Sequence, residues 1–395
     1  MSQVDLGSER ASAGHLSGRP NWIEIDADAI RGNLAATRQL LAPNTKVFGT
    51  LKANAYGFGV VGVAKILAQA GIDAISVSDL GDAIRLREAG IACPIVLYAG
   101  YLPSDAVVDA VTRHSIIPTI YDDVSAAAFA SRREKPTSFF VKVDVGLERI
   151  GIPAEKVGNF VAGVLRAPHL SLAGINTHFN VPAGEATVEA YIRWQAERFR
   201  AALASMKAAG IAVPVAVAES TGVFQVSSDL ALGAADPGQL LFGLSPDGKP
   251  HKVRGVRPAL KAIKSRVIQV RGIGRSDHFE IAPFPIQPGM RVGVIPIGMR
   301  DRMTHLSAGH VLVNGRRVPI LGAPALEYTR IDLTTCPEAK VGDEVVLAGA
   351  QGEENISPEE IVTFRKQRRV ADLAVAMPHD MRRDYLSSDS PRQPW

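Results

Sequence analysis

Short apolar runs alternate with amphipathic segments from Asn21 to about residue 255. The apolar run Lys46–Leu51 predicts a buried strand, and the helical segment GVAKILAQAG follows it after a turn-rich ANAYGFG. Helices are expected at Asp79–Ala89 and Asp105–Thr112. Further strands are expected at Asp73–Val77, Pro94–Tyr98, Ile116–Ile120, Ser138–Val143, Ser171–Thr177, Val213–Ala218 and Leu240–Gly243. Eight or nine such βα units favour a closed parallel barrel, with an open doubly wound sheet as the alternative.

The pattern changes near Pro258, where short β-type runs follow one another without a predicted helix before Ser357. Asn314–Gly315 predicts a two-residue hairpin turn. The fold expected is therefore α/β, a (β/α)8 TIM-type barrel followed by a mainly β C-terminal domain. Asn21–Ile25 predicts a strand that could join either domain. The expected domains are a disordered tail (1–20), the barrel (21–255), the β domain (256–385) and a flexible tail (386–395).

Composition and charge exclude several classes of protein. The net charge is +4, and the basic cluster Arg365–Arg369 lacks interleaved aromatic residues, which argues against nucleic-acid binding. No run of 18 apolar residues is present, and the first twenty residues lack the apolar core of a signal peptide, so neither a membrane span nor secretion is expected. Cys93 and Cys336 are too few for a disulfide framework or a zinc site, which favours a reduced, cytoplasmic setting without a bound metal.

Lys52 directly follows the first expected barrel strand, at the end where βα barrels place their chemistry. Leu51 and Ala53 leave little water around it, and desolvation lowers the pKa of a lysine and favours the neutral amine that forms an imine. The alternative is a lysine whose stem lies on the barrel rim with its ammonium in solvent.

The string TLKANAYGFG around Lys52 resembles KANAYGHG, the cofactor-lysine signature of the alanine racemase family. This family groups fold-type III pyridoxal-phosphate enzymes with a barrel and a C-terminal β domain. The resemblance extends from about Trp22 to Glu360. It includes AEST, which is similar to the family's ANSA, together with KVDVGLERIG, THF, GQLLFGLSP and VIPIG. It implies a pyridoxal 5′-phosphate-dependent amino-acid racemase, working as a homodimer with shared active sites on a small-molecule amino acid.

The resemblance implies a cofactor role for several residues. Lys52 would form the Schiff base with pyridoxal phosphate and act as the base on one face of the substrate Cα. Tyr56, Ser220 and the backbone N–H groups of Gly238 and Gln239 would contact the phosphate. Glycine lets backbone donors approach an anion closely.

Other matching residues are implied near the ring and the substrate. His178 would lie beside the pyridine ring, and Arg149 beside the phenolic oxygen and the substrate carboxylate. Lys142 matches a family lysine that is often carbamylated and orients this arginine. Leu326 and Met299 would face the substrate. Taken alone, His178 would be interpreted as a satisfied core histidine and Arg149 as a surface arginine.

One departure concerns the opposite-face acid. The family has a catalytic tyrosine in a GYGxxY segment of the second domain, but the corresponding stretch here, Asp277–Pro285 (DHFEIAPFP), contains none. Phe279 or Phe284 takes its place, and a phenylalanine cannot transfer a proton. Glu280 or His278 could substitute for the tyrosine.

A second departure is Asp236, which stands where family racemases have an arginine facing the pyridine nitrogen. A carboxylate raises the pKa of that nitrogen and makes a stronger electron sink. Its alternative is a turn aspartate before Pro-Gly. In addition, Met299 replaces an entry tyrosine, and Arg300 and Arg302 add positive charge nearby. A terminal tyrosine is also missing where His379 or Asp380 stands.

Three functions remain open at this point. The first is an amino-acid racemase, and the second is a pyridoxal-phosphate lyase, such as an amino-acid decarboxylase or aldolase, suggested by Asp236 and the missing tyrosine. The third is a non-catalytic homologue, against which the retention of Lys52 argues. Against a decarboxylase, the cysteine-bearing C-terminal motif expected of such enzymes is not found, since Cys336 lies in an ordinary turn. Against a metal-assisted aldolase, no His-x-Asp or His-x-Cys pair occurs late in the chain.

Overall fold

The computed structural model describes residues 18–132, 135–179, 188–220, 230–244, 253–274, 286–366 and 369–388. The chain forms two compact units. The barrel unit comprises Ile30–Ala55 and Val63–Arg257, and the β unit comprises Met1–Ala29, Tyr56–Gly62 and Pro258–Trp395. The segment Tyr56–Gly62, a few residues after Lys52, thus belongs to the β unit, although most of that unit lies far from it in sequence.

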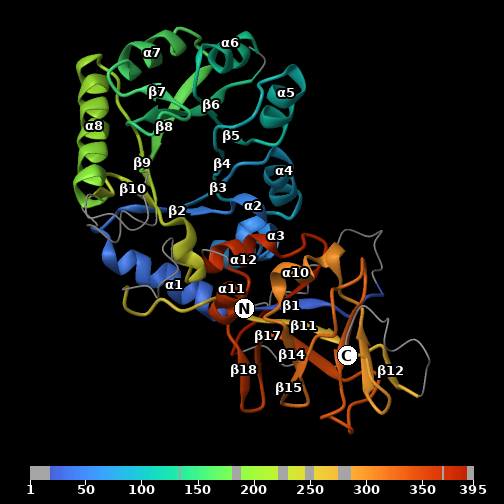
Figure 1. Ribbon diagram of the computed structural model, residues 1–395. Helices are drawn as coiled ribbons and strands as arrows, with labels where there is room; N and C mark the ends of the chain where they lie inside the picture. The colour runs from blue at the N-terminus through green and yellow to red at the C-terminus, as the bar shows by residue number, and fades with distance from the viewer. Residues whose placement is uncertain are drawn as a thin grey trace. The chain divides into compact units, whose positions relative to one another are not determined.

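Eight parallel strands close into a barrel in the first unit, as the alternating pattern predicted (Figure 1). They are β2 (Lys46–Thr50), β3 (Ala74–Val77), β4 (Ile95–Leu97), β5 (Ile117–Ile120), β6 (Thr137–Asp144), β8 (Leu170–His178), β9 (Ala216–Glu219) and β10 (Ala234–Asp236). Their order is β5-β4-β3-β2-β10-β9-β8-β6, and β6 pairs back with β5 to close the barrel. The short β7 (Ile152–Pro153) pairs with β6.

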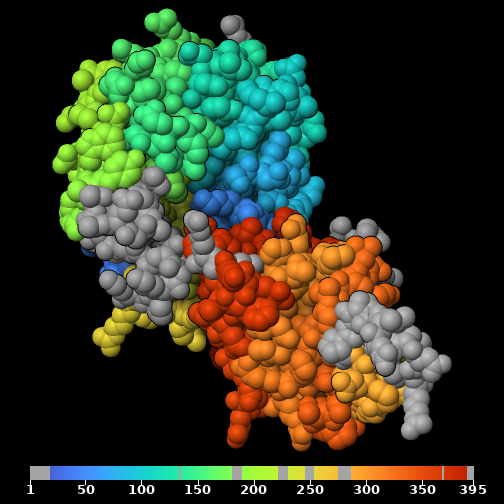
Figure 2. Space-filling model, viewed as in Figure 1, coloured from blue at the N-terminus to red at the C-terminus, as the bar shows by residue number. Residues whose placement is uncertain are grey.

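Helices follow most of the barrel strands, and in Figure 2 the segments from α4 to α8, cyan to yellow-green, form much of the visible surface of this unit. The helices that contribute residues to it are α1 (Ala27–Leu40), α3 (Val60–Gln69), α4 (Leu80–Glu88), α5 (Asp105–Arg113), α6 (Asp123–Ser131), α7 (Val157–Val164) and α8 (Val188–Ala208). Aspartate caps fix two of their starts: Asp79 accepts from the N–H of Asp82, and Asp122 from that of Ser125.

The strand expected at Leu240–Gly243 is wrong. This segment lies in the 3-10 helix η2 (Gly238–Phe242), and the eighth barrel strand is β10, a few residues earlier. Leu240, Leu241 and Phe242 are all fully buried. A short apolar run that is buried on all sides has no polar face, so its pattern does not separate a strand from a helix.

The β unit contains two antiparallel or mixed sheets, which confirms the mainly β prediction. The larger sheet has the order β15-β14-β17-β11-β1-β19, with β18 paired to β17, and the smaller one has the order β12-β13-β16. The strands are β1 (Trp22–Asp26), β11 (Leu260–Arg266), β12 (Gln269–Gly272), β13 (Arg291–Ile295), β14 (His310–Val313), β15 (Arg316–Pro319), β16 (Thr329–Asp332), β17 (Glu344–Gln351), β18 (Glu354–Ile356) and β19 (Arg382–Leu386).

Local details of the β unit agree with the sequence in one place and differ in another. Val313 pairs with Arg316, and Asn314 and Gly315 between them have φ values of 49° and 73°, which confirms the two-residue hairpin turn. Short helical turns nevertheless precede Ser357, at η4 (Met299–Asp301) and α10 (Met303–Leu306). The later helices are α11 (Pro358–Phe364) and α12 (Val370–Ala376).

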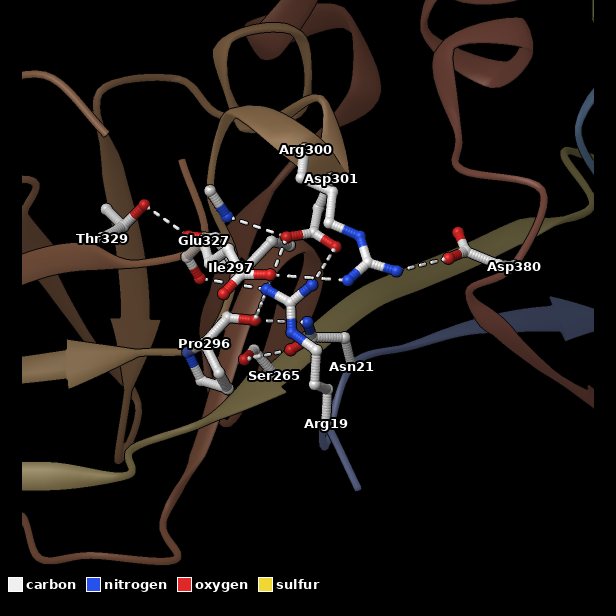
Figure 3. A network of polar contacts seen from close by, with 11 residues as sticks. Arg19, Asn21, Ser265, Pro296, Ile297, Arg300, Asp301, Glu327, Thr329 and Asp380 are labelled. Carbon is white, nitrogen blue, oxygen red and sulfur yellow. Dashed lines mark hydrogen bonds and ion pairs between the residues drawn. The ribbon is translucent and has the colours of Figure 1, made fainter. Parts of the chain in front are cut away.

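The first strand joins the β unit. β1 pairs antiparallel with β11 and parallel with β19, so the larger sheet unites both ends of the sequence. Just before it, within the stretch expected as a tail, Arg19 donates to both carboxylate oxygens of Asp301 at 3.0 and 2.8 Å. It also donates to the carbonyls of Pro296 and Glu327, at 2.6 and 3.0 Å (Figure 3). In the described part of the chain, no helix is long and apolar enough to cross a membrane.

Candidate active site

Lys52 begins a left-handed turn that directly follows β2 and Leu51. This turn, α2 (Lys52–Tyr56), has φ near 54° and ψ near 50° at Ala53, Asn54 and Ala55, and Tyr56 has a φ of 53°. For residues other than glycine this conformation costs about 1–2 kcal/mol each. Such strain persists where the surroundings enforce it, and it clusters at functional sites. Lys52 itself is half-buried.

The β unit holds the far end of this turn from two sides. The buried Arg383 guanidinium donates to the carbonyl of Gly57 at 2.9 Å, and the hydroxyl of Tyr385 donates to that of Phe58 at 2.8 Å. Gly57 has a φ of +89°, and a Cβ there would lie 1.9 Å from the carbonyl oxygen of Ala374. At Gly57 the chain therefore adopts a backbone conformation that only glycine permits there, and side chains of β19 hold it in place.

The barrel interior contains a polar layer. Its members are one side chain from each barrel strand or from the residue directly after it, all buried: Thr50, Ser76, Tyr98, Thr119, Lys142, Asn176, Glu219 and Asp236. We call this set the polar ring. An apolar cluster that includes Phe48, Val96 and Phe140 lies beside it, two residues earlier along several of the same strands. Because side chains on a strand alternate between its faces, this spacing of two places both layers inside the barrel.

Asp236 is the most densely hydrogen-bonded member of the polar ring. Its Oδ2 accepts from the hydroxyls of Tyr98 at 2.7 Å and Ser76 at 3.1 Å, and also from that of Thr50. Its Oδ1 accepts from the backbone N–H of Gly238 at 3.1 Å. Burial first, and then the charge of Asp236, raise the pKa of Tyr98 well above its ordinary value, so the phenol stays protonated and donates. The carboxylate is thus held by donors from three neighbouring strands.

Lys142 and Glu219 form a second buried pair in the polar ring. Lys142 Nζ donates to Glu219 Oε1 at 2.6 Å, and Glu219 Oε2 lies 3.9 Å from Nδ1 of His178. The second distance is too long for a hydrogen bond. The Lys142 ammonium also lies 5.6 Å from the centre of the Tyr98 ring, which connects this pair with the Asp236 cluster.

Burial and then three nearby cations, Lys142, Lys52 and Arg149, lower the pKa of His178 well below its ordinary value. The three cations therefore lie close enough to act on the imidazole, which is neutral at neutral pH. The cations come from the end of β2, from β6 and from the loop after β6, which all reach the carboxyl-terminal edge of the barrel. Positive charge is thus concentrated where βα barrels place their ligands.

The backbone of Arg149 is held in a loop that Asp144 organises. Asp144 Oδ1 accepts from the N–H groups of Gly146 and Leu147, both at 2.8 Å, and its Oδ2 accepts from the N–H of Arg149 at 3.2 Å. One carboxylate thereby folds the loop 145–149 over the end of β6. Arg149 itself is exposed, so its guanidinium is free to reach an anionic group.

The phosphate contacts expected from the sequence are only partly favoured by this geometry. The N–H of Gly238 already donates to Asp236, and the N–H of the half-buried Ser220 donates to the carbonyl of Asp236 at 3.2 Å. Tyr56 is buried in the β unit, where it ends the left-handed turn. Gln239 is half-buried in η2.

The remaining predicted residues lie in the β unit or outside the described residues. Met299 and Leu326 are both exposed and lie on adjacent segments, since Met299 N–H donates to the carbonyl of Ala325 at 2.9 Å. Asp380 is exposed and accepts from Arg300 at 3.0 Å. Outside the described residues lie Glu280, His278, Phe279 and Phe284.

The donor set fits pyridoxal phosphate. The cofactor needs a primary amine for its aldehyde, which Lys52 offers, and at the same edge of the barrel Arg149 offers a guanidinium for the phenolic oxygen and the substrate carboxylate. In addition, both polar atoms of the buried Asn176 side chain and the hydroxyl of Thr119 lack a hydrogen-bond partner among the described residues. Among those same residues, no group of three His, Cys, Asp or Glu side chains could hold a metal ion.

Six members of the polar ring were not singled out from the sequence, among them Glu219 and Tyr98. Glu219 was visible as the second residue of AEST, where the similar family string ANSA has asparagine. Tyr98 was only the last residue of an expected strand, and no local pattern indicates that it donates to Asp236, 138 positions away.

Comparison with known proteins gives the same family for both units. The model of the alanine racemase N-terminal domain matches residues 25–246, and that of the alanine racemase C-terminal domain matches residues 261–383. An alanine racemase of Syntrophobacter fumaroxidans is 35% identical over 351 residues, which are 86% of this chain and 91% of the relative. That of Methanococcus maripaludis is 31% identical over 86% of this chain and 92% of its own.

Solved structures agree with this. Alanine racemase from Clostridium difficile 630 superimposes with a TM-score of 0.82 at 25% identity, covering 95% of this chain and 97% of that one. Alanine racemase from E. faecalis superimposes with a TM-score of 0.79 at 28% identity, covering 94% and 99%. The likeness thus spans the barrel, the strained lysine turn and the β unit together, and the chain belongs to the alanine racemase family.

Proposed function

We propose that this chain is a pyridoxal-phosphate-dependent amino-acid racemase. The observation that carries the proposal is the placement of Lys52 at the end of β2, before a strained turn and within interaction distance of the same histidine as Lys142 and Arg149. A lysine retained in such surroundings is suited to imine formation. Its relatives named alanine racemase make racemisation of a small amino acid the first reaction to test.

Pyridoxal phosphate, when bound, would supply an electron sink that weakens the Cα–H bond of an amino acid. Lys52 would hold the cofactor and would take or return the Cα proton on one face. The exposed Arg149 offers a guanidinium to the substrate carboxylate. His178, half-buried and neutral, would line the site without adding positive charge.

Racemisation also needs an acid or base on the opposite face of Cα. We propose Glu280 for this role, with His278 as the alternative, because both stand in the segment where the family tyrosine is missing. The Glu280→Gln variant separates the two. If Glu280 is the opposite-face group, this variant exchanges the Cα proton with solvent but forms no opposite enantiomer. Unchanged racemisation in E280Q together with its loss in H278Q would assign the role to His278.

A lyase is the second candidate, and Asp236 favours it. The carboxylate is anchored by three hydroxyls on Oδ2, whereas Oδ1 accepts one hydrogen bond, from the N–H of Gly238, and a carboxylate oxygen can accept two. A carboxylate beside the ring nitrogen would favour its protonated form and widen the chemistry toward decarboxylation or aldol cleavage.

Proton NMR in D2O decides between the two. The purified protein with pyridoxal phosphate is given L-alanine and then a panel of L- and D-amino acids. Loss of the Cα proton signal with growth of the opposite enantiomer supports the racemase. Release of CO2 or an aldehyde, or exchange with retained configuration for every amino acid, contradicts it. Lys52→Arg should abolish the reaction, while Lys65→Arg on α3 should leave it unchanged.

We propose further that the working form is a homodimer with shared active sites, as the family resemblance implies. Light scattering coupled to size-exclusion chromatography would give the mass of two chains. A single-chain mass at assay concentration, with full activity, would contradict the dimer.

A further inference from the structure

The Lys142–Glu219 pair is shielded from solvent inside the barrel. Both residues are only 8% exposed, and the pair spans the barrel interior from β6 to β9 across β8. Among the described residues, Glu219 is the one carboxylate within ion-pair distance of Lys142. A buried ammonium needs such a partner, because removing one member of a buried pair leaves an uncompensated charge.

Each side chain counteracts the shift that burial causes in the pKa of the other. Burial lowers the pKa of Lys142, and Glu219 acts against this shift through its charge and its hydrogen bond. Burial likewise raises the pKa of Glu219, and Lys142 acts against it. Arg149 and Lys52 further disfavour the charged amine. Without Glu219, every remaining influence would drive Lys142 toward the neutral amine.

We propose that Glu219 is a positioning residue that keeps Lys142 a protonated, unmodified ammonium. Carbamylation, which the family resemblance implied for this lysine, requires the neutral amine: it adds CO2 to the nitrogen, forms an N–C bond and releases a proton. The product would place a second negative charge where Glu219 Oε1 now lies 2.6 Å from the nitrogen. Two anions at this separation in a buried site repel strongly.

An unmodified Lys142 changes which group can orient Arg149. A carbamate on Lys142 would attract Arg149, whereas the ammonium repels it, and the Asp144 loop fixes the backbone of Arg149 instead. Glu219 also lies 3.9 Å from His178, so it is the one described carboxylate within ion-pair distance of both. The inference goes beyond the racemase proposal, since the state of Lys142 is measured without reference to the reaction.

The test maps carbamates on the full-length protein, with and without pyridoxal phosphate. Protein equilibrated with 13C-bicarbonate is treated with an oxonium alkylating reagent that traps carbamates as esters, and peptides are then analysed by mass spectrometry. The wild type and the conservative Glu219→Asp variant should carry no label on Lys142. Glu219→Gln should carry it, because each unit by which the lysine pKa falls raises the neutral amine about tenfold.

The control is Glu344→Gln, which removes one of two carboxylates beside Lys264 and leaves Lys142 unlabelled. Should Glu219→Gln fail to fold, Glu219→Asn offers the asparagine of the string ANSA at this position. Label on Lys142 in the wild type would overturn the proposal, as would folded Gln and Asn variants without label at saturating bicarbonate. Either outcome is independent of whether the protein racemises an amino acid.

Discussion

Replacing Tyr98 with phenylalanine isolates one hydrogen bond of the polar ring. The change removes the hydroxyl that donates to Asp236 Oδ2 at 2.7 Å and keeps the ring, with the Lys142 ammonium 5.6 Å from its centre. Asp236 retains its donors Thr50 and Ser76. The variant therefore subtracts a single donor from a buried carboxylate without opening a cavity larger than one oxygen atom.

The expected loss in the free energy of unfolding depends on whether the hydrogen-bond acceptor is charged. A hydrogen bond to a charged group contributes about 1.5–3 kcal/mol, and one between neutral groups about 1 kcal/mol. Tyr101 provides the neutral comparison, because its hydroxyl donates at 2.8 Å to the backbone carbonyl of Thr119. Tyr98→Phe should thus lower the free energy of unfolding by about 2 kcal/mol, and Tyr101→Phe by about 1 kcal/mol.

Urea unfolding of the cofactor-free protein at pH 7, followed by circular dichroism, measures both values. The Asp236→Asn background completes a double-mutant cycle, in which the cost of Tyr98→Phe should shrink as the charge is lost. Equal costs for the two tyrosine variants, together with no coupling to Asp236, would refute an ionised Asp236 held by the phenol. That result would also remove the structural support for the lyase alternative.

Three further predictions concern other contacts. Arg383→Met should lower the free energy of unfolding by about 3–5 kcal/mol in urea titrations, because four hydrogen bonds from a buried cation to backbone carbonyls are lost, and it should also weaken the retention of pyridoxal phosphate. The control Arg382→Met, at a half-exposed neighbour, should lower the free energy of unfolding by only about 1 kcal/mol. Stability should fall as pH drops below 6.5, because the pKa of His178 is lower in the folded state than its ordinary value, and His178→Asn should remove up to about 1.4 kcal/mol per pH unit of this dependence. Arg19→Ala should lower the melting temperature by several degrees, since it leaves the buried Asp301 without its bidentate partner; an unchanged transition would show that the N-terminal contact adds no stability.

The barrel could be predicted from the sequence because its information is local and repeated. Each βα unit carries its own apolar run and amphipathic segment, so one misassigned element, such as Leu240–Gly243, leaves the architecture intact. The Asn314–Gly315 turn is local for the same reason, since it needs only two residues with positive φ. The position of Lys52 at a strand end is also a local feature, but its role as the cofactor lysine was predicted from the family resemblance of TLKANAYGFG.

Long-range pairings could not be predicted in this way. The partner of Lys142 is 77 positions away, and the donor that Tyr98 offers to Asp236 is 138 positions away. Which side chains meet inside the barrel depends on the stagger of its strands, which no single strand encodes. For the same reason, the sequence left open which unit β1 would join, until its pairing with β11 and β19 decided it.

Glu219 and Asp236, two carboxylates that depart from the family pattern, are electrostatically coupled. Both are buried carboxylates of one polar ring, and Asp236 contributes to the raised pKa of Glu219. Removing the Asp236 charge should therefore lower the Glu219 pKa and strengthen its hold on Lys142. It follows that Asp236→Asn, which would weaken any lyase chemistry, should leave Lys142 without a carbamate, as in the wild type. A 13C carbamate on Lys142 in the Asp236→Asn variant would contradict this electrostatic coupling between Asp236 and Glu219.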